Sequence, residues 1–206
     1  MINLRPHQLS ALDAMSASNK GQVIVPTGGG KTICMIEDAK REFSKDGLKT
    51  IVVVAPRILL ANQLSSEFLE LIDDVDVLHV HSGETHHFST TNSIDLTHWN
   101  STNPHYHKLI FTTYHSLHKI QNSMVDVDTI YFDEAHNSVQ KNFFPATEHF
   151  SHLAQRCYFF TATPKHSRSP VKAGMNWPEY GQVICQVPAP KLVKEGYILP
   201  PKVEVY

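Results

Sequence analysis

Hydrophobic positions along this chain alternate between short continuous runs and segments in which they recur at helical spacing. Short, continuous β-branched runs are typical of strands that are buried on both faces. They predict seven strands, at residues 22–26, 50–55, 75–80, 108–112, 129–133, 156–161 and 182–187. Apolar residues at helical spacing predict helices at 5–18, 32–43, 58–72, 114–122, 138–153 and 189–196. Two polar stretches, 82–107 and 164–181, are predicted to be loops.

The order of these predicted elements indicates the fold class. Strands alternate with helices, which favours an α/β fold with a mostly parallel, doubly wound sheet of about seven strands and helices on both faces. Ligands of such sheets bind beyond the carboxyl ends of the strands. Motifs that directly follow a strand are therefore the first candidates for a functional site.

The composition of the chain indicates how many domains it forms and which kinds of partner it can bind. The chain has 206 residues, which is the size of one domain, and 18 basic against 20 acidic side chains give a net charge of -2. Any surface that binds nucleic acid must therefore be local. The cysteines Cys34, Cys157 and Cys185 are scattered, which favours a reducing cytoplasm over a disulfide framework. Since no apolar run reaches the length of a signal peptide or membrane span, no membrane partner is expected.

A glycine-rich segment, VPTGGGKT at 25–32, stands between a predicted strand and a predicted helix. This is the context of a phosphate-binding loop, in which backbone amides surround phosphate oxygens. Lys31 would neutralise the β- and γ-phosphates, and the Thr32 hydroxyl would ligate Mg²⁺. Val25 departs from the general motif, which has glycine at that position. The alternative is an ordinary glycine turn followed by a solvated lysine.

A second motif, DEAH at 133–136, follows an apolar strand. Nucleotide hydrolysis needs one acidic group to hold Mg²⁺ and another to orient or deprotonate the attacking water. Asp133 and Glu134 fit these two roles, although an isolated pair could be a solvated strand end. Several predicted βα units separate Lys31 from Asp133, as a nucleotide pocket across neighbouring strand ends would allow.

A third motif, TATP at 161–164, also follows an apolar strand. Alone it indicates little more than a turn. Its weight comes from the order of the three motifs along the chain.

In this order, the motifs resemble the first RecA-like domain of a superfamily 2 helicase or translocase. The resemblance covers essentially the whole chain. Three further segments also match motifs of this family: LRPHQ at 4–8, APR at 55–57 and TTYHSL at 112–117. TATP together with the RPHQ start is closest to type III restriction helicase subunits and DNA-repair helicases. DEAH-box RNA helicases usually read SAT at the third motif, so DEAH alone does not indicate RNA.

The resemblance implies a role for each matching position. It implies that ATP and Mg²⁺ are the ligands, with Lys31, Asp133 and Glu134 catalytic and Thr32 and Asp133 holding the metal. Nucleotide contacts are implied for Arg5, Gln8, Thr27, Gly28, Gly29, Gly30, Lys31 and Thr32. Coupling of nucleotide state to nucleic acid is implied for His136, Thr161, Ala162 and Thr163. Contacts to a nucleic-acid strand are implied for Pro56, Arg57, Thr113 and Ser116.

One part of the family pattern is missing from this sequence. Superfamily 2 motors hydrolyse ATP between two RecA-like domains, and the second supplies an arginine finger. We expect an ATP-binding domain at 1–196 and the start of a linker to a second domain at 197–206. Because an arginine finger contributes about 10³–10⁵ in rate, hydrolysis by this chain alone should be very slow.

The sequence predicts an ATP-dependent helicase or translocase and favours DNA over RNA as its nucleic acid. Other readings stay open: an RNA helicase, a module that binds nucleotide and nucleic acid without turnover, the motor of a restriction system, and a phosphate-loop enzyme for a small molecule. Nine of the 14 histidines lie between His79 and His118, including the pair at 86–87. Without cysteines or regular spacing they do not predict a metal site. If exposed, they would strengthen nucleic-acid binding below about pH 6.5.

Overall fold

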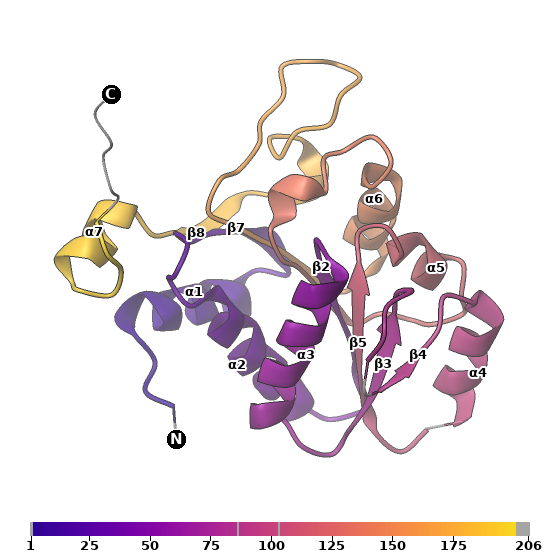
Figure 1. Cartoon of the computed structure of the whole chain (residues 1–206). Coiled ribbons are helices and arrows are strands. Elements are labelled where there is room, and N and C mark those ends of the chain that lie inside the picture. Colours follow the sequence, from indigo (N-terminus) through magenta and orange to yellow (C-terminus); the bar gives the residue numbers. More distant parts are fainter. Residues whose placement is uncertain (1, 86, 103, 201–206) are drawn as a thin grey trace.

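A single parallel sheet of eight strands organises the computed structural model, which describes residues 2–85, 87–102 and 104–200 (Figure 1). The strand order is β4-β3-β5-β2-β6-β7-β1-β8. The strands are β1 (Lys20–Ile24), β2 (Thr50–Ala55), β3 (Val75–Val80), β4 (Phe88–Ser89), β5 (His107–Thr113), β6 (Thr129–Phe132), β7 (Arg156–Thr161) and β8 (Val183–Gln186). All seven predicted strands are present, and the α/β class is confirmed. The sheet has one strand more than expected, because two residues of β4 pair with β3 at its edge.

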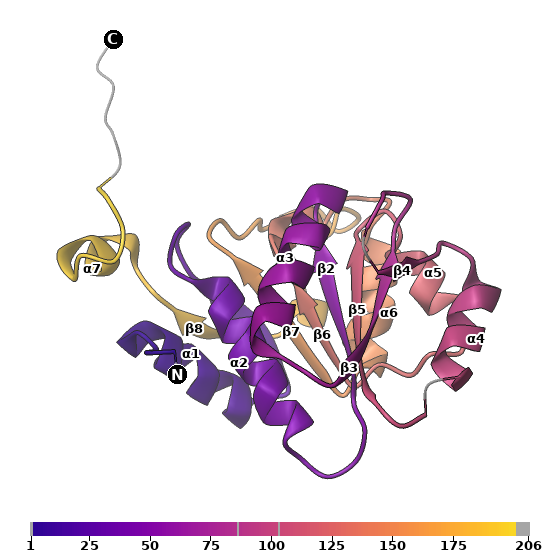
Figure 2. The same ribbon diagram turned by 60° about the horizontal axis from the view of Figure 1, so that its bottom comes forward.

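Helices cover both faces of this sheet, as predicted (Figure 2). The helices are α1 (Pro6–Ala17), α2 (Lys31–Phe43), α3 (Ile58–Leu71), α4 (Ser93–Thr102), α5 (Leu117–Gln121), α6 (Phe144–Leu153) and α7 (Ala189–Lys194). Alternate strand residues face opposite cores. Val53 and Tyr131 pack under α1, α2 and α3, whereas Val52 and Phe132 pack under α4, α5 and α6. Burial on both faces explains why the strands read as continuous apolar runs.

The prediction of a loop throughout 82–107 is wrong. This segment contains β4 and the helix α4. Only Leu96 and Trp99 of α4 are buried, so the apolar pattern is too sparse to reveal a helix. Asn92 stabilises its first turn, since its Oδ1 accepts a 2.8 Å hydrogen bond from the Ile94 amide. Tertiary packing and the Asn92 cap therefore stabilise α4, although its polar, serine- and threonine-rich composition does not favour a helix.

Two helices begin later than predicted, because polar contacts hold the preceding residues in turns. The helix expected at 114–122 begins at Leu117, because the Ser116 amide forms a turn with the Thr113 carbonyl at 3.1 Å. The helix expected at 138–153 begins at Phe144. Ser138 lies in the preceding turn, where its hydroxyl meets the Tyr180 hydroxyl at 2.8 Å. The Ser116 amide and the Ser138 hydroxyl are thus held in turns, and each helix begins only after its turn.

A buried ion pair connects α2 to the sheet. Both guanidinium nitrogens of Arg156 donate to the Asp38 carboxylate at 2.8 Å, and Asp38 also accepts a hydrogen bond from the Tyr131 hydroxyl. Glu42 lies 3.1 Å from the same guanidinium. Asp38 is only 1% exposed, so Arg156 satisfies a charge that water cannot reach.

The described end of the chain packs against its beginning. The Arg5 guanidinium lies 5.0 Å from the centre of the Tyr197 ring, and the His7 ring lies 5.6 Å from it. Tyr197 and Ile198, expected at the start of a linker, thus contact the core, while 201–206 lie outside the described residues. Among the described helices, none is both long and apolar enough to cross a membrane.

Candidate functional site

The three motifs that follow strands meet at one edge of the sheet. The glycine-rich loop follows β1, DEAH follows β6 and TATP follows β7. In the sheet β7 lies between β6 and β1, so the first two motifs do not follow adjacent strands. Thr161 at the end of β7 therefore stands between them. Its carbonyl accepts a hydrogen bond from the Val25 amide at 3.1 Å, which ties TATP to the start of the glycine-rich loop.

The glycines of the loop are required by its geometry. Gly28 and Gly30 have φ of +80°, a left-handed conformation that side chains disfavour. A Cβ on Gly29 would lie 2.4 Å from a methyl carbon of Val25. Val25 is fully buried, so the valine at the position of the usual first glycine belongs to the core. The loop leads into α2 at Lys31, with backbone amides at the helix start that suit an anion.

The start of α1 holds this loop from the side through three side chains. Gln8 donates to the Gly30 carbonyl at 3.1 Å, and an Arg5 guanidinium nitrogen lies 3.4 Å from the Gly28 carbonyl. His7 contacts the Gly29 carbonyl at 2.6 Å. Because a carbonyl only accepts, the His7 Nε2 carries the proton. Arg5 and Gln8 thus lie beside the glycine-rich loop, and their contact with a nucleotide stays a prediction.

Lys31, Asp133 and Glu134 converge, as the sequence predicts. The Lys31 ammonium forms an ion pair with Glu134 Oε1 and lies 3.5 Å from Asp133 Oδ1. All three side chains are at least two-thirds buried. The ammonium therefore lies between the glycine-rich loop and the two carboxylates of the DEAH motif.

Asp133 is suited to a divalent cation. Its Oδ1 is buried and accepts no hydrogen bond from any described residue, although the Lys31 ammonium lies 3.5 Å away. Burial raises the pKa of the Asp133 carboxyl, Lys31 lowers it, and Glu134 raises it further. A cation at this oxygen would favour the charged carboxylate. The residues present therefore fit Mg²⁺, and Thr32 follows Lys31 directly on the first turn of α2.

Glu134 has a backbone conformation that is unusual for a glutamate. Its φ of 48° and ψ of 52° place it in the left-handed region, at the start of the 3₁₀ helix η1 (Ala135–Asn137). The Asn137 side-chain amide donates to the Glu134 carbonyl at 2.9 Å and helps to hold this turn. The strain falls on a residue with a predicted catalytic role, as is common at active sites.

The predicted coupling residues are also in contact. His136 Nδ1 lies 2.8 Å from the Thr161 hydroxyl and 3.6 Å from Glu134 Oε2. The Thr163 amide donates to the same Thr161 oxygen at 3.1 Å, with Ala162 between them. Burial lowers the pKa of His136, while Glu134 raises it. A chain of contacts therefore runs from the DEAH motif to the TATP motif.

The predicted strand-binding residues are only partly brought together. Pro56 and Arg57 line a hollow of about 410 Å³ that also includes Glu134, His136 and His115. Arg57 is exposed, and Ser116 is half-buried. Thr113 is 3% exposed, so its side chain is closed to an outside strand. A larger hollow of about 950 Å³ lies beside α3 and contains none of the predicted residues.

Two supporting residues had not been predicted as part of the site. The Tyr114 hydroxyl donates to the Asp133 carbonyl at 2.6 Å and fixes the strand end that carries the carboxylate. His7 holds the Gly29 carbonyl, as described above. Both are neighbours of predicted residues in their motifs. Tyr114 is 2% exposed and His7 is 3% exposed. The spacing of residues in the sequence does not reveal this burial.

The histidine-rich segment contains a hydrogen-bonded chain of neutral rings. The Gly83 amide donates to His81 Nδ1 at 3.1 Å, so the proton of His81 is on Nε2. That nitrogen donates to His79 Nδ1 at 3.0 Å, and His79 Nε2 donates to the Ser65 hydroxyl at 3.1 Å. Ring nitrogens used in this way are not metal ligands. Burial and the neighbouring His81 lower the pKa of His79 to about 3.

Acid is expected to destabilise the fold through this chain of rings. Burial also lowers the pKa of His81. Unfolded histidines bind a proton below about pH 6.5, so the unfolded chain takes up more protons as the pH falls toward 3. The free energy of unfolding should decrease below pH 6.5 by up to about 1.4 kcal/mol per pH unit for each histidine. Urea unfolding at several pH values measures this slope.

The slope should be smaller in His79→Gln and unchanged in His118→Ala, whose side chain is exposed. Equal slopes in wild type and His79→Gln would contradict the assignment. His98 and His105 are exposed. His86 lies outside the described residues.

The family described as "Type III restriction enzyme, res subunit" matches residues 1–166, which include all three motifs. The chain belongs to this family. The resemblance to superfamily 2 helicases is thereby confirmed, together with its restriction-helicase branch. None of the curated protein sequences shows a significant match.

Solved structures share the fold of this res-subunit domain. The Type ISP restriction-modification enzyme LlaGI, solved as a nuclease-deletion mutant with a DNA substrate mimic, is 21% identical over 95% of this chain with a TM-score of 0.79. LlaBIII, an ATP-dependent Type ISP enzyme bound to DNA, is 20% identical over 95% with a TM-score of 0.78. The Hef helicase domain of Pyrococcus furiosus is 22% identical over 79% with a TM-score of 0.57. The chain spans 21%, 16% and 34% of those proteins, respectively.

Proposed function

We propose that this chain is the ATP-binding domain of a DNA helicase or translocase. The contact of Lys31 with Asp133 and Glu134 carries the proposal, because it joins a phosphate-binding lysine to two carboxylates at the same sheet edge. The chain of contacts through His136 and Thr161 supports a motor over a simple nucleotide-binding protein.

The residues divide the work of hydrolysis among them. Lys31 and the amides at the start of α2 bind and orient the phosphates. Asp133 and Thr32 would hold Mg²⁺, which would neutralise phosphate charge. Glu134 takes the proton from the attacking water. His136 contacts both Glu134 and Thr161, so a movement of Glu134 would be transmitted through His136 to the TATP turn.

DNA is the favoured nucleic acid in this proposal, and the restriction-system motor is its second candidate. Support for DNA comes from the structural neighbours LlaGI and LlaBIII, which were solved with DNA. The family description supports the restriction system. In either case a second RecA-like domain would supply the arginine finger, and a low rate is expected for this chain alone.

Nucleic-acid-stimulated ATP turnover tests the proposal. We would measure it for this chain and for a chain that carries a second RecA-like domain, with single-stranded DNA, duplex DNA or RNA. The expected result is DNA-stimulated turnover in the longer chain and very slow turnover in the shorter one. Stimulation by RNA alone would overturn the preference for DNA. Turnover that no nucleic acid changes would overturn the motor.

A further inference from the structure

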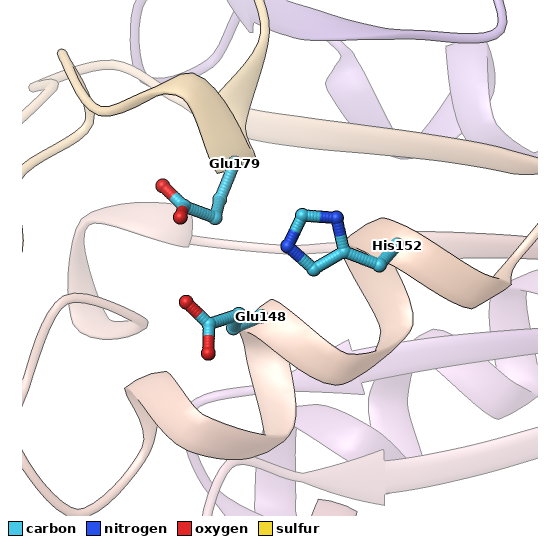
Figure 3. A group of neighbouring side chains, drawn as sticks. All are labelled: Glu148, His152 and Glu179. Atoms are coloured by element: carbon cyan, nitrogen blue, oxygen red, sulfur yellow. The ribbon is translucent and has the colours of Figure 1, made fainter.

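Two glutamates and a histidine gather between α6 and the 3₁₀ helix η2 (Pro178–Tyr180), and none of them belongs to the proposed ATP site. Glu148 and His152 lie on α6, and Glu179 lies on η2. One possible ligand atom of each lies within 4.8 Å of the other two. Figure 3 shows the three side chains pointing into a shared space between α6 and η2.

The fold positions all three side chains. Glu148 and His152 are four residues apart, which places them one above the other on the same side of α6. The Ser151 hydroxyl of α6 donates to the Glu179 carbonyl, so the backbone of η2 is fixed against the helix. The next residue, Tyr180, is fully buried and anchors η2 from the other side.

The two carboxylates of this cluster have no basic partner among the described residues. In the part of the chain that the structure describes, neither Glu148 nor Glu179 forms an ion pair with a lysine or arginine. Oε2 of Glu179 is buried and makes no hydrogen bond to any described residue. A buried carboxylate oxygen without a partner is unfavourable, and a second carboxylate nearby adds repulsion. A divalent cation between them would remove both costs.

We propose that Glu148, His152 and Glu179 bind a zinc ion. One imidazole and two carboxylates form a ligand set that zinc accepts, with water in the fourth position, whereas the imidazole disfavours Mg²⁺ and Ca²⁺. Bonds of about 2.0–2.2 Å place tetrahedral ligands roughly 3.3–3.6 Å apart. The side chains reach this spacing by small rotations, since His152 is exposed and both glutamates are half-buried.

Bound zinc would connect α6 to the end of the segment that begins with the TATP motif. That segment, 164–181, leaves the ATP site and returns to the sheet through η2. Because the ion binds only the folded arrangement, it stabilises the protein in proportion to its concentration and affinity. The site is independent of the proposed function, and nothing in it requires ATP or nucleic acid.

Calorimetric titration with zinc chloride, in the absence of nucleotide and Mg²⁺, tests the site. We expect saturable binding and a rise in the thermal unfolding midpoint that a chelator reverses. His152→Ala and Glu179→Gln should each weaken zinc binding at least about 10-fold. His118→Ala is the matched control, an exposed histidine on α5, and should bind zinc as wild type does. Any shift of the midpoint by magnesium chloride should be the same in wild type and His152→Ala, because Asp133, the proposed Mg²⁺ ligand, is unchanged in both.

Two results would overturn the proposal. One is the absence of saturable zinc binding by the wild-type protein. The other is unchanged zinc affinity in both His152→Ala and Glu179→Gln, which would place the ion at another part of this histidine-rich chain. Glu148→Gln provides a third variant at a half-buried position, and circular dichroism of each variant without zinc checks that it folds.

Discussion

Turnover of ATP is expected to fall by about 10²–10⁴-fold when Glu134 is replaced by glutamine in a chain that carries both RecA-like domains. Glutamine keeps the shape of the side chain but cannot take a proton from water. Lys31 would lose one ion-pair partner and keep Asp133 at 3.5 Å. ATP binding should therefore remain. The rate is measured by phosphate release at saturating ATP and DNA, and binding by a fluorescent nucleotide.

Glu70→Gln is a matched control for this experiment, because Glu70 is exposed on α3 and its loss should leave turnover unchanged. Glu134→Gln should also unfold at nearly the same temperature as wild type, since it keeps the same left-handed backbone residue. Wild-type turnover in Glu134→Gln would falsify the role of Glu134 as general base. Loss of binding as well as turnover would assign Glu134 to nucleotide binding instead.

Replacing Asp38 by alanine is expected to destabilise the folded protein by about 3–5 kcal/mol. The replacement removes the paired hydrogen bonds from Arg156 to Asp38 and leaves the buried guanidinium with Glu42 at 3.1 Å and the Met15 carbonyl at 3.3 Å. It also removes the acceptor of the Tyr131 hydroxyl. The cost thus arises from the lost buried pair, the incompletely satisfied guanidinium and the unsatisfied hydroxyl. Chemical unfolding measures it directly.

Asp46→Ala is the corresponding control, because Asp46 is exposed beyond the end of α2. Its effect should stay within about 0.5 kcal/mol. The double variant Asp38→Leu with Arg156→Met should be more stable than Asp38→Ala alone, since it removes both charges together. A cost below about 1 kcal/mol for Asp38→Ala, of the size found for exposed pairs, would mean that water reaches the pair.

The strands could be predicted from the sequence because burial on both faces leaves a simple signal. The bounds of β2, β3 and β7 agree with the predicted ranges to the residue. By contrast, α4 buries only Leu96 and Trp99 and is held by packing, which composition does not record. The late start of α6 depends on the contact of Ser138 with Tyr180, more than forty residues along the chain. Such contacts become visible only in three dimensions.

The predicted site divides in a similar way. Lys31, Asp133 and Glu134 could be identified because their two motifs follow strands, and parallel strands end at one edge of the sheet. That β7 lies between β6 and β1 does not follow from the order of elements along the chain. The burial of Thr113 was also unpredictable, since its motif specifies the residue type and not its accessibility.

The left-handed backbone of Glu134 has a consequence for how this protein could change over generations. Such a conformation costs a residue with a side chain about 1–2 kcal/mol, and glycine would relieve the cost. Glycine at this position would therefore favour folding while removing the carboxylate. A lineage that no longer needed ATP hydrolysis would gain stability from that replacement. Glutamate in so unfavourable a conformation is the residue that selection for turnover, and not for stability, would keep.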